Sequence, residues 1–238
     1  MGRTILFFIA FFMATSAFAQ HLFITTEEYP PYNTRGMDGH PTGVYMDQLK
    51  IVFEKTRIDY TSAIMPWARA IALAESTPMH CVAGAARTPS RESQFKWVSP
   101  VHTDRNVLVA LKNRYLRFKA LGYAKDYLIG TQRNDYTQEV LQSLGFMHID
   151  LSSDFDKTLS KLVAGRIDLM PMSESALRLL SPSVFEEVAV LTEQSLGMAC
   201  HRDVPDELIG KMQSALDTLI ADGTQRKIYE QYGLVIRQ

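Results

Sequence analysis

Arg91 is the residue whose chemistry points most directly to a ligand. It follows the segment Gly84-Ala85-Ala86, which is expected to form a loop at the end of a short apolar strand. A guanidinium group presents paired N–H donors that match the two oxygens of a carboxylate, and neighbouring main-chain N–H groups can complete an anion site. A surface ion pair with Glu92 or another acid would also explain the arginine. The sequence therefore predicts either a carboxylate-binding arginine or a surface ion pair here.

Two aromatic residues offer flat surfaces that could contact the same ligand. Tyr29 lies in a proline-rich loop, and Trp67 follows Pro66 at the expected start of a helix. Two aromatic faces can enclose an apolar or cationic group, although both side chains could equally belong to the hydrophobic core. Arg69 lies two residues after Trp67 on the same expected helix. It either adds a second cation to the site or lies in solvent.

A third group of candidate residues is Asn134-Asp135-Tyr136, at the start of another expected helix. The N–H groups at a helix N-terminus can bind a polar or anionic group of a ligand. Asn134 or Asp135 can also serve simply as the helix cap, and capping alone explains both residues. The sequence leaves the two roles open.

These candidates lie near the ends of alternating strands and helices. The apolar patterns predict strands over residues 22–26, 59–64, 80–85, 107–111, 128–131, 167–172 and 196–201. They predict helices over residues 45–53, 68–74, 136–144, 155–163, 208–220 and 224–232. Such alternation predicts largely parallel sheets covered by helices, with a ligand beyond the carboxyl ends of the strands. The number of strand-helix pairs exceeds what one small sheet takes, so we expect two interleaved lobes.

The overall composition excludes some classes of partner. The chain has 25 basic and 26 acidic residues and a net charge of −1, so it lacks the strongly basic character of many nucleic-acid-binding proteins. Its six histidines and two cysteines show no spacing typical of a zinc site. No phosphate-binding loop, dinucleotide fingerprint or Gly-x-Ser-x-Gly motif is found. We therefore expect no nucleic acid, no metal, no cofactor and no catalysis.

The N-terminal residues have the features of a secretory signal. Arg3 precedes an apolar run over residues 5–14, and small residues at Ala17 and Ala19 suit cleavage before Gln20. The run is too short to span a membrane, which takes about twenty residues. We expect residues 1–19 to be a signal peptide and the remainder to reach the periplasm of a Gram-negative bacterium. An uncleaved membrane anchor is the alternative.

Export affects the interpretation of Cys81 and Cys200, because an oxidising compartment permits a disulfide. Both cysteines lie in short apolar segments that are expected to be strands. Two buried free thiols are at least as compatible with this pattern as a disulfide.

Several motifs, in order along the chain, resemble those of the family 3 periplasmic solute-binding proteins. They occupy residues 26–32, 41–43, 65–70, 88–91, 128–144, 164–168 and 222–233. The resemblance covers nearly all of the chain after the signal. It implies a two-lobed α/β fold of the type II periplasmic binding proteins, with a two-stranded hinge and a ligand between the lobes. The first lobe would comprise residues 20–104 and 196–238, and the second lobe residues 105–195.

The resemblance also implies roles for the candidate residues. Arg91 corresponds to the arginine that grips the ligand carboxylate in amino-acid binders, with Gly84 and Ala86 nearby. Tyr29 and Trp67 correspond to aromatic ligand contacts. Ser173 lies where amino-acid binders usually carry an acid for the ligand ammonium, so the ligand is expected to be a small carboxylate-bearing solute, an amino acid or a related anion.

Three functions are compatible with this family. The resemblance favours a monomeric receptor that binds its solute and delivers it to an ATP-driven (ABC) importer. Some relatives are cyclohexadienyl dehydratases, in which Glu174 could be the proton donor. Similar modules also serve as sensor domains of membrane receptors.

Overall fold

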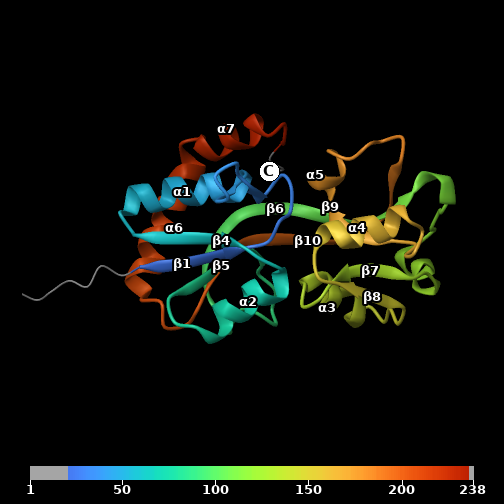
Figure 1. The fold of residues 1–238 in the computed structure, drawn as a ribbon, viewed down its shortest axis with the longest axis horizontal. Helices are drawn as coiled ribbons and strands as arrows, with labels where there is room; N and C mark the ends of the chain where they lie inside the picture. The colour runs from blue at the N-terminus through green and yellow to red at the C-terminus, as the bar shows by residue number, and fades with distance from the viewer. Residues whose placement is uncertain (1–20, 236–238) are drawn as a thin grey trace, which may run out of the picture.

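Two lobes joined by two long strands make up the molecule. The computed structural model describes residues 21–235, so the signal peptide expected at residues 1–19 lies outside the described residues. The connecting strands are β6 (Lys96–Leu111) and β10 (Phe185–Cys200), which contain 16 residues each. They pair in antiparallel fashion along most of their length and run from one lobe into the other (Figure 1).

The first lobe combines the beginning and the end of the described chain (Figure 1). Its elements are β1 (Leu22–Thr26), β2 (Thr34–Arg35), β3 (Pro41–Thr42), α1 (Val44–Thr56), β4 (Tyr60–Ile64), α2 (Trp67–Ser76), β5 (His80–Ala86), α6 (Asp206–Ala221) and α7 (Thr224–Gln231). The second lobe contains η1 (Lys112–Arg114), η2 (Leu121–Asp126), β7 (Ile129–Gln132), α3 (Tyr136–Ser143), β8 (Ile149–Ser152), α4 (Phe155–Val163), β9 (Met170–Ser173) and α5 (Glu174–Leu177). The predicted two-lobed α/β fold is confirmed. The exact lobe boundaries remain a prediction.

The main sheet has six strands in the order β4-β1-β5-β10-β6-β9. The expected parallel arrangement holds for β1 with β4 and β5, and for β7 with β8. The prediction of mostly parallel sheets is wrong for the rest, because β10 runs antiparallel to β5 and β6, and β6 runs antiparallel to β9. The hinge imposes this: β10 must return from the second lobe along the strand that led into it.

Helices cover both faces of the first-lobe sheet and bury separate hydrophobic clusters. On one face, Leu49 and Phe53 of α1 pack with Leu216 of α6 and Tyr229 of α7. On the other face, α2 contributes Trp67 to a smaller cluster. The second lobe has two hydrophobic clusters of its own. Each lobe therefore has its own core.

Cys81 and Cys200 form a disulfide in this structure. Cys81 lies on β5 and Cys200 on β10, and the antiparallel register places them directly opposite each other. The sequence pattern alone was at least as compatible with two buried free thiols as with a disulfide. The pairing of β5 with β10 brings the two cysteines together, and they form the disulfide.

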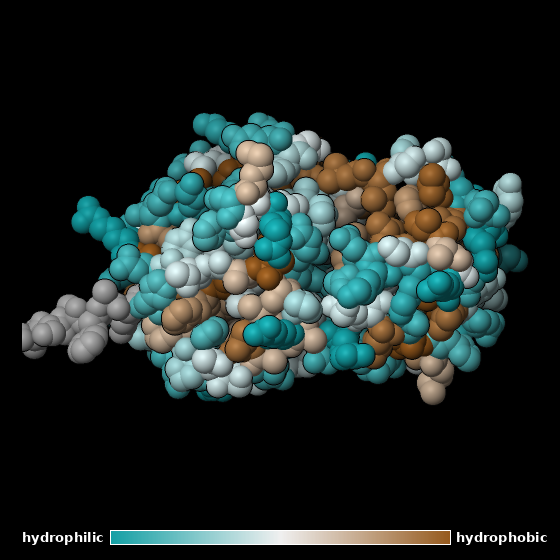
Figure 2. Space-filling view, viewed as in Figure 1, coloured by the Kyte–Doolittle hydropathy of each residue, from teal (hydrophilic) through white to brown (hydrophobic). Residues whose placement is uncertain are grey.

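The surface carries scattered hydrophobic side chains and no membrane-spanning helix among residues 21–235. The face in Figure 2 is largely hydrophilic, and hydrophobic residues gather on the second lobe near α4 and α5. Val163, Leu179 and Val184 are among the exposed apolar side chains in that part of the chain.

Gly43 packs against the loop that contains Tyr29 and Tyr32. Its φ is +110°, and a Cβ there would lie 2.6 Å from the carbonyl oxygen of Tyr32. We expect Gly43→Ala to lower the free energy of unfolding by about 3 kcal/mol, because backbone strain and a backbone clash add together. Urea denaturation measures this. Gly39→Ala is the matched control, since Gly39 also has a positive φ of +83° but no atom within 4 Å of a Cβ; an equal loss in both variants would contradict the clash.

Candidate functional site

A small cavity of about 40 Å³ lies between the lobes. We call it the interlobe cavity. Residues from both lobes and from the hinge strands line it: Glu27, Tyr29, Tyr32, Tyr45, Asp104, Arg105, Asn106, Thr131, Gln132, Asp135, Tyr136, Thr137, Phe155, Thr158, Met170, Pro171, Ser173 and Leu196. A space of this size holds one or two water molecules. The lobes are therefore closely apposed around it.

Aromatic side chains form much of its wall and connect the lobes. The hydroxyl of Tyr29 accepts a hydrogen bond of 2.8 Å from the backbone N–H of Ser173, and the Tyr29 ring lies 4.6 Å from that of Phe155. The hydroxyl of Tyr32 donates to Asp104 Oδ2 at 2.9 Å and lies 2.6 Å from Ser173 Oγ. The structure thus brings Tyr29 and Ser173, both expected from the sequence, into contact in one cavity.

The interlobe cavity is rich in carboxyl groups. Glu27 from the loop after β1, Asp104 from β6 and Asp135 before α3 all line it. Arg105 is the one basic side chain among the described lining residues, and its guanidinium already pairs with Glu187 at 2.9 Å and Glu174 at 3.5 Å. Among the described residues, the cavity is therefore lined by more acidic than basic side chains.

Burial shifts the ionisation of these carboxyl groups in different directions. Burial, reinforced by the negative charge of Asp135, raises the pKa of Glu27 to about 8. Burial also raises the pKa of Asp135, although hydrogen bonds from Thr137 and the charge of Arg91 oppose it. Burial acts on Asp104 as well, but His102 and the backbone N–H of Ser175 outweigh it and hold the pKa of Asp104 below its usual range.

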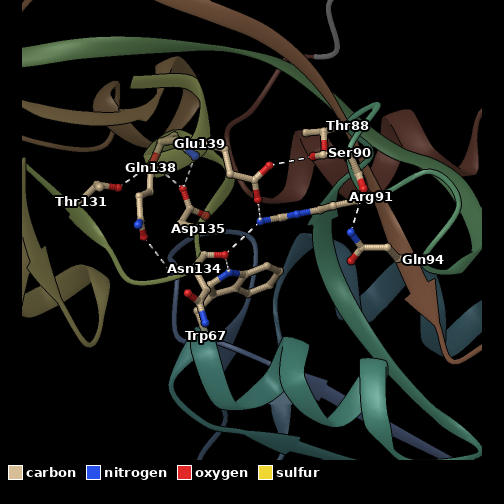
Figure 3. A network of polar contacts seen from close by, with 11 residues as sticks. Trp67, Thr88, Ser90, Arg91, Gln94, Thr131, Asn134, Asp135, Gln138 and Glu139 are labelled. Carbon is tan, nitrogen blue, oxygen red and sulfur yellow. Dashed lines mark hydrogen bonds and ion pairs between the residues drawn. The ribbon is translucent and has the colours of Figure 1, made fainter. Parts of the chain in front are cut away.

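Arg91 lies beside the interlobe cavity and bridges the two lobes, in a set of residues that we call the Arg91 cluster: Trp67, Ser90, Arg91, Asn134 and Glu139 (Figure 3). The Arg91 side chain is 5% exposed. Arg91 Nη2 donates to the Asn134 carbonyl oxygen at 2.9 Å and to Glu139 Oε1 at 2.8 Å. Ser90 Oγ donates to Glu139 Oε2 at 2.8 Å, and Trp67 Nε1 donates to the Asn134 carbonyl oxygen at 2.9 Å. The cluster holds the rims of the lobes together.

Local backbone geometry explains why Asn134 can serve both partners. Asn134 has a φ of +61°, a left-handed conformation that asparagine tolerates, and it turns the chain just before α3. Asp135 then caps the helix by accepting a hydrogen bond of 2.9 Å from the Thr137 N–H. The structure confirms the capping role of Asp135, and Tyr136 and Asp135 both line the cavity. Their contact with a ligand remains a prediction.

Arg91 keeps some donor capacity for a ligand. Its Nη1 atom is buried and has no hydrogen-bond acceptor among the described residues. A groove of about 550 Å³ runs past Arg91, Asn134 and Glu139 and shares Asp135 with the interlobe cavity. Glu92, the ion-pair partner suggested by the sequence, binds Arg87 instead. The sequence-based alternative of an ion pair is thus realised with a different acid, Glu139 of the opposite lobe.

Other candidate residues lie outside the interlobe cavity. Arg69 is exposed on α2 and is absent from the cavity lining, so the structure supports the solvated alternative. Ala86 is buried in β5 opposite Leu196, and Gly84 packs against Tyr45. The expected loop at residues 84–86 is wrong, since pairing with β10 extends the strand through Ala86. Trp67 is buried in the core, and its indole N–H donates a hydrogen bond to the Asn134 carbonyl oxygen of the second lobe.

Sequence reasoning missed Tyr32, Asp104, Gln132 and Glu139. Tyr32 belongs to the same proline-rich loop as Tyr29, and its aromatic type was a usable signal. Asp104 lies among other polar residues of the hinge strand β6, so the sequence does not distinguish it from its neighbours. Gln132 and Glu139 acquire their roles only when the lobes close, so no local pattern could identify them.

Two α/β lobes around a hinge-spanned cavity define a two-lobed solute-binding protein. The chain matches the model of the bacterial extracellular solute-binding proteins, family 3, over residues 22–235. It belongs to this family, whose members are extracellular or periplasmic.

Solved structures show the same fold. A histidine kinase sensor domain with similarity to periplasmic binding proteins has a TM-score of 0.81 and 18% identity, covering 92% of this chain and 99% of that one. An ancestral arginine-binding protein bound to arginine has a TM-score of 0.79 and 21% identity, with coverage of 90% and 98%. An amino acid ABC transporter substrate-binding protein from Streptococcus pneumoniae Canada MDR_19A, bound to L-arginine, has a TM-score of 0.78 and 16% identity. The match covers 92% of this chain and 96% of that one. None of the curated proteins matches the chain in sequence.

Proposed function

We propose that this protein captures a small solute that carries both a carboxylate and a cationic group, as a basic amino acid does. The observation that carries the proposal is the position of a buried arginine beside a cavity with three carboxyl groups and several tyrosines. The sequence favoured an anionic or carboxylate-bearing solute, an amino acid included, because it offered two candidate arginines and no acid at Ser173, with Glu27 and Asp135 among the possible substitutes. The carboxyl groups of the cavity supply the missing acid from other positions.

The carboxylate of the solute would bind Arg91. Nη1 of Arg91 is a buried donor without an acceptor among the described residues, and a carboxylate oxygen would satisfy it. The Glu139 side chain is 44% exposed, so it can rotate into solvent and release Nη2 for a second hydrogen bond. The N-terminus of α3 adds partial positive charge on the same side.

The cationic group of the solute would lie in the interlobe cavity, with the lobes further apart than in this structure, because a cavity of about 40 Å³ admits only water-sized groups. Glu27 and Asp135 are its nearest candidate partners, and burial makes an ion pair there stronger than in water. Tyr29, Tyr136 and Phe155 provide aromatic surface for the connecting carbon atoms and for cation-π contact. Closure follows because the solute contacts both lobes at once only in the closed form.

A thermal-shift screen of residues 20–238 tests this proposal. At about one hundred times its dissociation constant a solute adds roughly 2.7 kcal/mol of stability. We expect L-arginine or L-lysine to raise the melting temperature by several degrees, and dicarboxylates such as succinate to leave it unchanged. Glu27→Gln should abolish the shift, whereas the neighbouring Glu28→Gln should keep it, since Glu28 binds the Arg35 N–H outside the cavity. A shift with succinate alone would contradict the proposed charge pattern.

We propose delivery to an ABC-type importer in the periplasm of a Gram-negative bacterium, with the protein acting as a monomer after signal cleavage before Gln20. The similarity to an ABC transporter substrate-binding protein supports the importer, and a disulfide suits an oxidising compartment. Uptake of labelled solute should fall in cells that lack the protein.

A role as a ligand-sensing module is the second candidate, favoured by the similarity to a histidine kinase sensor domain. It predicts unchanged uptake and a lost transcriptional response in the same cells.

Catalysis has less support than transport or sensing. Glu174, the candidate proton donor, pairs with Arg105 and Arg178 and is absent from the cavity lining. Absence of prephenate turnover is the expected result.

A further inference from the structure

Glu27 joins the two lobes through a buried hydrogen bond. It follows β1 in the first lobe, and its Oε2 accepts a hydrogen bond from Nε2 of Gln132, the last residue of β7 in the second lobe. Glu27 is 8% exposed. Because Gln132 of the second lobe contributes to this burial, we expect separation of the lobes to expose the Glu27 carboxyl group to water.

The charged groups that act on Glu27 in the closed arrangement are carboxyl groups, and the nearby Arg91 is paired with Glu139. Asp135 at the start of α3 and Asp154 before α4 act on it with negative charge. Asp104 of β6 lines the same cavity, with the hydroxyls of Tyr29, Tyr32, Tyr45 and Tyr136, and Arg105 is committed to Glu174 and Glu187. An ionised Glu27 would be an uncompensated buried charge among like charges, which proteins avoid by neutralising the group.

We propose that Glu27 takes up a proton when the lobes close without solute and exchanges that proton for the cationic group of the solute when solute is bound. In this exchange the Glu27 carboxylic acid loses its O–H proton to the solvent, and the resulting carboxylate pairs with the solute cation. Glu27 is then either neutral or paired with a cation in both closed forms. The solute half of this inference rests on the proposed function, and the proton half does not.

The coupling has a defined direction. In the closed form burial raises the pKa of Glu27 to about 8, whereas an exposed glutamate has its ordinary value near 4.5. The closed form therefore binds more protons than the open form between these two values. Lowering the pH favours closing, and raising it favours opening, by at most about tenfold in the closed-to-open ratio per pH unit.

A distance measurement without solute tests the proton half. Spin labels on Lys50→Cys in the first lobe and Lys119→Cys in the second lobe report the separation of the lobes, and both positions are exposed. We expect the closed fraction to fall as the pH rises from about 5 to 8. Glu27→Gln, which is neutral at every pH, should show a flat profile. Glu27→Asp keeps a titrating group and should retain the slope.

Glu28→Gln is the matched control, because Glu28 is the next residue and its carboxylate binds the Arg35 backbone N–H outside the cavity. It should behave as the unmodified protein does. Thermal unfolding of each variant confirms that it is folded. Identical pH profiles for the unmodified protein and Glu27→Gln would overturn the proton uptake.

Calorimetry with L-arginine tests the exchange. Binding at pH 6, measured in two buffers of different ionisation enthalpy, should release about one proton per arginine bound to the closed protein, and Glu28→Gln should release the same number. Binding without proton release by a protein that is closed at this pH would overturn the exchange. If the distance profile has the expected slope and arginine does not bind, the proton uptake stands and the proposed solute is wrong.

Discussion

Replacing both Cys81 and Cys200 by alanine should lower the free energy of unfolding by about 4 kcal/mol. The disulfide closes a loop with a sequence separation of 119 residues, and restricting so long a loop removes much conformational entropy from the unfolded chain. The loop contains the entire second lobe. The double variant should unfold at a lower urea concentration and with a steeper dependence on urea, because the unfolded chain without the crosslink is less compact; circular dichroism measures both.

Reduction of the unmodified protein is the control for this prediction. Dithiothreitol should reproduce the loss of stability and should have no effect on the double alanine variant. The disulfide lies in the sheet at β5 and β10 and is absent from the lining of the interlobe cavity, so arginine affinity should change much less than stability. A loss below about 1 kcal/mol would show that the closed loop contributes little.

Local elements were predictable where the pattern of apolar residues is local. The strand over residues 22–26 is observed with the same bounds, and every residue in it except Phe23 is buried. The helix after Pro66 begins at Trp67, as a proline at a helix N-terminus favours. The observed α7 also ends within a residue of its predicted end.

The hinge strands show where local patterns fail. Only residues 107–111 and 196–201 were predicted as strands, whereas β6 begins at Lys96 and β10 at Phe185. The missing part of β10 has a short apolar run over residues 188–191 between charged and polar residues, and most of it is only partly buried, so it lacks the strict alternation of a half-buried strand. Pairing with β6 forms it, and that pairing joins residues about 80 positions apart, from Asn106 with Thr192 to Leu111 with Phe185.

The candidate site was predictable to the extent that it depends on residue type and strand ends. Tyr29, Asp135, Tyr136 and Ser173 all line the interlobe cavity. The environment of Arg91 was not predictable, because Glu139 reaches it from the other lobe and is 48 residues away in sequence. Charge balance in a cleft depends on which side chains meet when two lobes close, and composition does not contain that information.

Arg91→Ala should weaken the binding of L-arginine by about a hundredfold or more. The variant removes a buried guanidinium that would hold the solute carboxylate, and loss of a buried charge-assisted pair costs roughly 2 to 5 kcal/mol. The same variant also removes the contacts of Arg91 with Glu139 and Asn134, which join the lobes. Titration calorimetry with a second solute separates these two effects.

Agmatine, which is arginine without its carboxylate, provides that separation. If Arg91 binds the carboxylate, Arg91→Ala should reduce arginine affinity strongly and agmatine affinity little. Equal losses for both solutes would mean that Arg91 acts only by holding the lobes together. Glu139→Gln completes the comparison, because it removes the ion pair and keeps the guanidinium; it should maintain or increase arginine affinity, since Glu139 competes with the solute carboxylate for Nη2. A hundredfold loss in Glu139→Gln would assign the cluster to lobe closure instead of solute recognition.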